Sequence, residues 1–177
     1  MEEETIAEFE RLVGDHLDML FTLSRRLTDT SHDAEDLVQD TCLDAWRAWH
    51  RGEEPEAPRA WLATLCLNRA RSRWRRRAVR PLEHLTRDVR ATASDPRDAT
   101  RSVESIALAN VEASWVRELL DQLPAPQREA ICLMDLCGFT ASEAGRILGA
   151  PRNTILSRVH RGRQQLALLL IAQEAPR

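Results

Sequence analysis

The chain has 177 residues, a formal net charge of −3 and an apolar content of 43%. This length fits one domain or two small ones, and the apolar content is sufficient for packed cores. No apolar run is long enough to span a bilayer, and the acidic N-terminal stretch is unlike a basic signal sequence. We therefore expect a cytoplasmic protein without membrane insertion. The four scattered Cys are unlike a secreted disulfide framework, so buried reduced thiols are expected.

Charge is distributed unevenly along the chain. Residues 1–58 hold 16 acidic residues and five Arg, whereas residues 59–82 hold eight Arg and no acidic residue. All 25 basic residues are Arg, so every cationic side-chain contact to an anion uses a forked guanidinium. This polarity predicts one partner that binds acidic side chains and another that binds arginines.

Apolar residues at three- and four-residue spacing predict a first helix over residues 3–27 and a second that starts near Ser31 or Asp33 and ends at about His50. Asp33, Asp36, Asp40 and Asp44 follow one another at the same spacing, so they lie along one side of the second helix. Acidic residues are favourable at a helix N-terminus, which accounts for Asp33 and Asp36 but not for the two later ones. An acidic stripe of this length indicates a docking surface for a basic partner.

A third helix is predicted from about Pro58 to Arg77, after a loop at residues 51–59. Seven of the eight Arg of the basic block lie in it, and without intervening acids they would repel one another as a solvated face. Such a row is better matched to phosphates, whose neutralisation releases counterions. Trp61 and Trp74 fit either the core of this helix or stacking on unpaired bases.

No sustained period follows in residues 81–101, which predicts a flexible linker between two small helical domains, residues 1–80 and 102–177. Further helices are predicted from Ser102 to Leu123 and from Gln127 to Cys137. The chain contains no alternating strand-like run. The predicted fold is therefore all-α.

The C-terminal domain contains a candidate helix-turn-helix. Thr140 and Glu143 form a T-x-x-E capping box, Gly149 suits the left-handed end of a short helix, and Pro151 suits the start of the next one. Arg and Asn on the free side of that next helix are residue types that bind phosphates and base edges in the major groove. A helical hairpin with a solvated charged face fits the same pattern, but the excess of Arg over acids between Gly138 and Gln165 favours DNA binding.

Three passages together resemble sigma factors of bacterial RNA polymerase, of the small extracytoplasmic-function class. These are "DAEDLVQDTCLDAW" (33–46), "RAWLATLCLNRARSRWRRR" (59–77) and "LPAPQREAICLMDLCGFTASEAGRILGAPRNTILSRVHRGRQQL" (123–166). The resemblance implies binding to the clamp of the polymerase core through Asp33, Glu35, Asp36, Gln39 and Asp40. It implies contact with the unpaired minus-ten strand through the loop at 51–59 and Trp61, Asn68, Arg69, Arg71, Arg73 and Arg76. It implies duplex contact at the minus-thirty-five element through Arg152, Asn153, Thr154, Ser157, Arg158 and Arg161.

The same resemblance implies a non-catalytic factor that is monomeric when free. It would bind the β′ clamp and the β flap of polymerase, promoter DNA and an anti-sigma factor, with no cofactor and no metal. Leu156 stands where the family usually has Lys or Arg, and Gly145 replaces a common Ala, which lowers helix propensity.

Other interpretations of the chain stay open at this point. An ordinary helix-turn-helix regulator would explain residues 123–170 but neither the acidic stripe nor the Arg-rich helix, and it would usually form a dimer on a two-fold site. A nucleic-acid enzyme lacks an apparent nucleophile–base pair. A metal site at Cys132, Cys137 and His160 would depart from the usual C-x-x-C ligand spacing.

Overall fold

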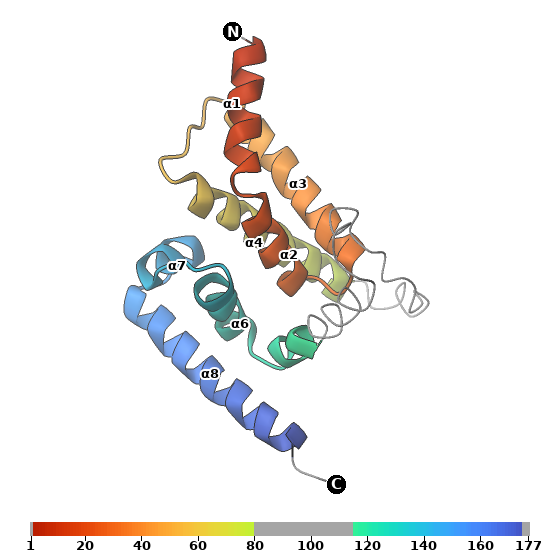
Figure 1. The fold of residues 1–177 in the computed structure, drawn as a ribbon, viewed down its shortest axis with the longest axis vertical. Coiled ribbons are helices and arrows are strands. Elements are labelled where there is room, and N and C mark those ends of the chain that lie inside the picture. The colour runs from red at the N-terminus through yellow and green to blue at the C-terminus, as the bar shows by residue number, and fades with distance from the viewer. Residues whose placement is uncertain (1, 80–114, 175–177) are drawn as a thin grey trace, which may run out of the picture.

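The computed structural model describes residues 2–79 and 115–174, and the secondary structure of these residues is entirely helical (Figure 1). The prediction of an all-α fold is confirmed for this part of the chain. The elements are α1 (Glu2–Gly14), α2 (Leu17–Leu27), α3 (Ser31–Trp49), α4 (Pro58–Val79), α6 (Ala125–Ile131), the π-helical turn η2 (Cys132–Leu136), α7 (Ala141–Leu148) and α8 (Arg152–Glu174). Residues 115–121 are also helical. The predicted linker at 81–101 and the start of the helix predicted from Ser102 lie outside the described residues.

The single helix predicted over residues 3–27 is wrong, because the chain breaks between α1 and α2. Gly14 is a weak helix former, and the backbone N–H of His16 bonds to the Val13 carbonyl at 3.0 Å, closing the helix in a tighter turn. The break lets α1 turn its own apolar side against α3, where Phe9 meets Trp46 edge-to-face with ring centroids 4.9 Å apart. The hydrophobic spacing was therefore continuous across two separate helices.

Helices α2, α3 and α4 form the N-terminal bundle. Leu20 and Leu23 of α2, Leu37 of α3, and Leu62 and Cys66 of α4 are fully buried. Helix α3 begins where expected, because the Thr30 hydroxyl oxygen accepts a hydrogen bond from the backbone N–H of Asp33 at 3.0 Å. This packing fixes which sides of α3 and α4 face outward.

The C-terminal helices α6, α7 and α8 form a second helical unit. The helix predicted over 127–137 is regular only as far as Ile131 and then continues as η2, in which the Cys137 N–H bonds to the Cys132 carbonyl at 2.9 Å. Ile155 and Val159 of α8 are buried, as the spacing predicts. Their burial leaves the opposite side of the start of α8 facing outward.

The two units pack against each other. Helices α6 and α7 lie between α8 and the N-terminal bundle in Figure 1, with contacts from α7 to α4 and from η2 to α2. Buried side chains of both units belong to one continuous hydrophobic cluster, which includes Leu62 of α4 and Phe139 in the turn before α7. The two units that contain the segments predicted to bind nucleic acid are thus in direct contact.

Candidate nucleic-acid interface

The start of α8 presents the polar face that the sequence predicts. Arg152, Asn153, Ser157 and Arg161 are exposed, whereas Thr154 and Arg158 are partly buried. Among the residues that the structure describes, the side chains of Arg152 and Arg158 make no hydrogen bond or ion pair to another side chain. The Arg161 guanidinium donates to the Ser157 carbonyl within the helix at 3.2 Å. Two guanidinium groups at this helix start therefore retain their full capacity to bind phosphates and base edges.

The turn before α8 is held by contacts within a few residues. Glu143 accepts hydrogen bonds from the backbone N–H and the hydroxyl of Thr140, at 2.8 and 2.7 Å, which completes the predicted capping box. These hydrogen bonds lower the pKa of the Glu143 carboxyl. Gly149 adopts the left-handed conformation with φ of 63° and ends α7. The capping box and the glycine together set the direction in which α8 leaves the turn.

Gly145 in α7 lies where two segments of the backbone approach each other closely. A Cβ atom at this position would lie 2.7 Å from the carbonyl oxygen of Ala150, on the other side of the turn. Only a residue without a Cβ permits this close approach of the backbone. The low helix propensity of Gly145 is thus the cost of a tight turn in this chain.

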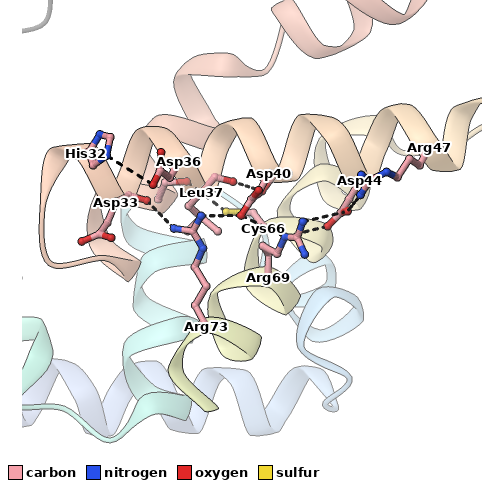
Figure 2. Close-up of polar contacts among 12 residues, drawn as sticks. His32, Asp33, Asp36, Leu37, Asp40, Asp44, Arg47, Cys66, Arg69 and Arg73 are labelled. Carbon is pink, nitrogen blue, oxygen red and sulfur yellow. Dashed lines mark hydrogen bonds and ion pairs between the residues drawn. The ribbon is translucent and has the colours of Figure 1, made fainter. Parts of the chain in front are cut away.

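Figure 2 shows the predicted acidic stripe along α3, with Asp40 and Asp44 beside Arg69 and Arg73 of α4. Glu35 and Gln39 are exposed, while Asp33, Asp36 and Asp40 are partly buried. Asp36 lies 3.9 Å from the exposed His32, one helical turn earlier. The first half of the stripe is therefore accessible to a basic partner.

The second half of the stripe is paired with arginines of α4. Asp40 accepts a hydrogen bond from the Arg73 guanidinium at 2.7 Å, and the Arg69 Nε lies 3.5 Å from the same carboxylate (Figure 2). Arg69 also lies 3.3 Å from Asp44, and Arg73 donates to the Asp33 carbonyl at 3.2 Å. Acids from another helix therefore neutralise Arg69 and Arg73 in this arrangement. The predicted contact of these two arginines with phosphates stays a prediction.

Two more arginines of α4 bind the C-terminal unit. Arg71 donates to both carboxylate oxygens of Glu129 in α6, at 2.8 and 2.6 Å, and only 7% of the Glu129 side chain is exposed. These hydrogen bonds raise the pKa of Arg71. The Arg59 guanidinium lies 4.2 Å from the centre of the Phe139 ring and donates to the Cys137 carbonyl. The basic block thus holds the two units together, a role that the local sequence pattern does not indicate.

The remaining predicted minus-ten residues differ in exposure. Asn68 and Arg76 are exposed, and Trp61 is partly buried against the hydrophobic cluster. The Arg128 guanidinium of α6 covers Trp74, 4.8 Å from the ring centre. A cleft of about 630 Å³ opens between α4 and α6 beside these residues, and it is lined by Asn68, Arg71, Ser72, Trp74, Arg75, Ala125, Pro126 and Glu129. Most of the cleft wall thus comes from the helix predicted to meet the unpaired strand.

The four cysteines are free thiols, and three of them are buried. Burial raises the pKa of Cys66 and Cys137 to about 11 and that of Cys132 to about 12. His160 is exposed on α8, whereas Cys132 and Cys137 are buried. Within residues 2–79 and 115–174, no group of three or more His, Cys, Asp or Glu side chains is arranged to hold a metal ion. No described helix is long and apolar enough to cross a membrane.

Comparison with protein families finds two matching regions. Residues 12–80 match the family model described as Sigma-70 region 2, and residues 113–166 match the one described as Sigma-70, region 4. These regions contain the acidic stripe and the arginines of α4 in the first case, and the helix-turn-helix in the second.

Curated relatives carry both regions in the same chain. The chain is 34% identical over 166 residues to the ECF RNA polymerase sigma factor SigE of Mycolicibacterium smegmatis, which covers 93% of this chain and 62% of SigE. It is 34% identical over 162 residues to the ECF RNA polymerase sigma factor SigM of Mycobacterium tuberculosis, which covers 92% of this chain and 76% of SigM. An ordinary helix-turn-helix regulator does not account for these matches.

Two solved structures have a similar fold. One is CnrH in complex with the cytosolic domain of CnrY, with a TM-score of 0.68 and 28% identity over 93% of this chain and 88% of that one. The other is the sigma factor RpoE of Bartonella quintana in complex with the anti-sigma factor NepR, with a TM-score of 0.66 and 30% identity over 91% of this chain and 97% of that one.

Proposed function

The chain belongs to the ECF class of the sigma-70 family of RNA polymerase sigma factors, and from this premise we propose that it binds core polymerase and starts transcription at specific promoters. The observation that carries the proposal is the free guanidinium pair at the start of α8, in the same chain as an accessible acidic half of α3. One surface suits DNA, and the other suits a basic protein.

In this proposal three surfaces bind three different partners. Glu35, Asp36 and Gln39, with Asp33 and Asp40 beside them, bind the β′ clamp of the core enzyme. Helix α4 binds the unpaired minus-ten strand through Asn68, Arg76 and the arginines that are now internally paired, with Trp61 nearby. The face of α8 that contains Arg152, Asn153 and Arg158 reads the minus-thirty-five duplex, while the C-terminal unit contacts the β flap.

The two units must separate for this function. Elements at minus ten and minus thirty-five are about 25 base pairs apart, which is about 85 Å of B-form DNA at 3.4 Å per base pair. In the structure, α4 and α7 are in direct contact. The described arrangement is therefore a closed form, and promoter binding requires residues 1–80 and 102–177 to act as domains on an extended connection.

We also propose an anti-sigma factor as a partner and the cytoplasm as the compartment. Support comes from CnrH and RpoE, which are similar in fold and were solved with CnrY and NepR respectively. A factor that serves polymerase needs access to the chromosome. No catalytic step is part of the proposed function.

The test is run-off transcription with purified core polymerase and a library of promoter fragments. The proposed function predicts defined transcripts that depend on both the chain and the core enzyme. Core enzyme that produces the same transcripts with and without the chain would contradict it. Analytical ultracentrifugation of the mixture would separate one-to-one association with polymerase from the dimer expected of an ordinary regulator.

A further inference from the structure

Asp40 and Asp44 each contribute to two surfaces at once, and this inference rests on the proposed function. Asp40 is one of the residues proposed to bind polymerase, and Asp44 follows it one turn later in the same stripe of α3. Their carboxylates neutralise Arg69 and Arg73 of the helix proposed to bind DNA. We propose that these ion pairs form an exchange switch. A basic partner that engages the two carboxylates releases the two guanidinium groups for the unpaired strand.

The geometry places each group within reach of a competitor. The side chains of Asp40 and Asp44 are 33% and 30% exposed, and those of Arg69 and Arg73 are 26% and 24% exposed. A guanidinium that approaches α3 from solvent can therefore reach the carboxylates without unfolding either helix. Figure 2 shows the four groups in one row between α3 and α4.

Arg69 is the weaker partner in the row. Its Nε is buried, and among the described residues it has no hydrogen-bond acceptor in good geometry. Its contact with the Asp44 Oδ1 is long, at 3.4 Å. A buried donor without an acceptor is unfavourable, so Arg69 gains by moving onto a phosphate. Arg73, at 2.7 Å from Asp40, is held more firmly and exchanges second.

The expected gain in affinity for single-stranded DNA follows from the exposure of the ion pairs. Ion pairs this accessible contribute about 0.2–1 kcal/mol each, which corresponds to a factor of about 1.4 to 5 in affinity per pair. Releasing both arginines should therefore strengthen binding to single-stranded DNA by the product of two such factors, about 2- to 25-fold. Because coupling between two ligands is reciprocal, bound DNA should strengthen polymerase binding by the same factor.

The experiment mimics partner binding by removing the carboxylate charges in the free chain. Asp40→Asn with Asp44→Asn is compared with Glu35→Gln and Asp36→Asn, which makes the same change in net charge on the same helix but touches no arginine of α4. The probe is a fluorescein-labelled oligothymidylate of about 20 nucleotides at low salt, because backbone contacts to single strands tolerate any sequence. Binding is followed by fluorescence anisotropy without polymerase.

The switch predicts that Asp40→Asn with Asp44→Asn binds the probe about 2- to 25-fold more tightly than the parent chain. The dependence of affinity on salt should also be steeper, by up to about 1.4 in the log–log slope. Glu35→Gln with Asp36→Asn should change affinity by less than about twofold. Equal gains in the two variants would mean that net charge alone acts, and weaker binding by the first would mean that the carboxylates orient the arginines productively. Either result overturns the switch.

A further variant confirms the source of any gain. When Arg69→Gln and Arg73→Gln are added to Asp40→Asn with Asp44→Asn, the gain should vanish. A gain that persists would show that other cations bind the probe, and the switch would be wrong. Circular dichroism melts of every variant establish that each is folded. Polymerase is absent from these assays, so failure of the parent chain in run-off transcription would reject the proposed function without deciding the switch.

Discussion

Glu129 accepts two hydrogen bonds from Arg71 and so connects α6 to α4, across the boundary between the two helical units. Its carboxylate is almost completely buried, whereas the Arg71 side chain is 35% exposed. Glu129 has therefore lost nearly all its contact with water, and Arg71 provides the hydrogen bonds that replace it. Loss of the negative charge of Glu129 should weaken the closed form.

We expect Glu129→Gln to weaken the contact between the units by about 1–3 kcal/mol, because the amide keeps one acceptor oxygen but places an N–H donor against the second N–H of Arg71. Small-angle X-ray scattering should show a larger radius of gyration. Asp135→Asn is the matched control, since Asp135 pairs with Arg163 inside the C-terminal unit. Equal scattering curves from both variants would contradict a role of Glu129 in closure.

Arg158→Ala should weaken binding to a promoter duplex by about 1–3 kcal/mol if Arg158 contacts a base. Its guanidinium lies at the start of α8 without a protein partner among the described residues. Arg163→Ala is the control, because it removes the same charge from α8 at an arginine that already donates to Asp135. Electrophoretic mobility shifts on a promoter fragment should separate the two variants. Similar losses of DNA affinity in the two variants would mean that the face of α8 that contains Arg158 is not the one that reads the duplex.

Charge reversal of Glu35 and Asp36 to Arg should weaken binding to core polymerase by about 100-fold or more, since like charges opposed across an interface cost several kcal/mol. Reversal of Asp40 is less informative, because it would place a cation against Arg73 and disturb α4. The control is charge reversal of Glu8 and Glu10 to Arg, because both are exposed on α1 and the change in net charge is the same. Surface plasmon resonance on immobilised core enzyme provides the comparison. Retained binding would mean that the stripe is a solvated surface.

Gly145→Ala should destabilise the folded chain by about 1–3 kcal/mol, although alanine is the better helix former. The added Cβ would meet the rigid carbonyl of Ala150 at 2.7 Å. Ser142→Ala, at an exposed position of the same helix, should change stability by less than about 0.5 kcal/mol. Urea unfolding followed by circular dichroism measures both. A stabilised Gly145→Ala variant would show that the turn can relax.

Native chain should react with Ellman's reagent at Cys42 first, because the other three thiols are buried and their pKa values are raised to about 11 or 12. The same shifts affect stability. Between the ordinary pKa of 9.0 and the raised values, the unfolded chain loses thiol protons that the folded chain retains. Stability should therefore fall as the pH rises above about 9. Rapid modification of all four thiols in folded protein would contradict their burial and favour a redox sensor.

Local patterns were read correctly from the sequence. The capping box at Thr140 and Glu143, the left-handed Gly149 and the buried Ile155 and Val159 depend on neighbours within a few residues, so spacing and residue type suffice to predict them. The start of α3 at Ser31 was predictable for the same reason. The outward faces of α3 and α8 followed from these local features.

Contacts between distant segments were not predictable from a single sequence. The partners of Arg73 and Arg71 lie 33 and 58 residues away, and nothing in the local pattern shows which acids face which arginines. Gly145 was taken as a loss of helix propensity because its neighbour Ala150 lies across a turn. The break at Gly14 was missed because the apolar spacing continues through it. The predicted roles of the site residues in binding polymerase and DNA stay predictions.

Arg59, Arg69, Arg71 and Arg73 are all held in contacts within the protein, and this has a consequence for the chain in the cell. A chromosome offers about 10⁶–10⁹ non-specific sites, and affinity for them depends on the number of phosphates that free cations can neutralise. With four guanidinium groups occupied within the protein, the chain has less attraction for bulk chromosomal DNA. More of it then stays free to diffuse and search for polymerase.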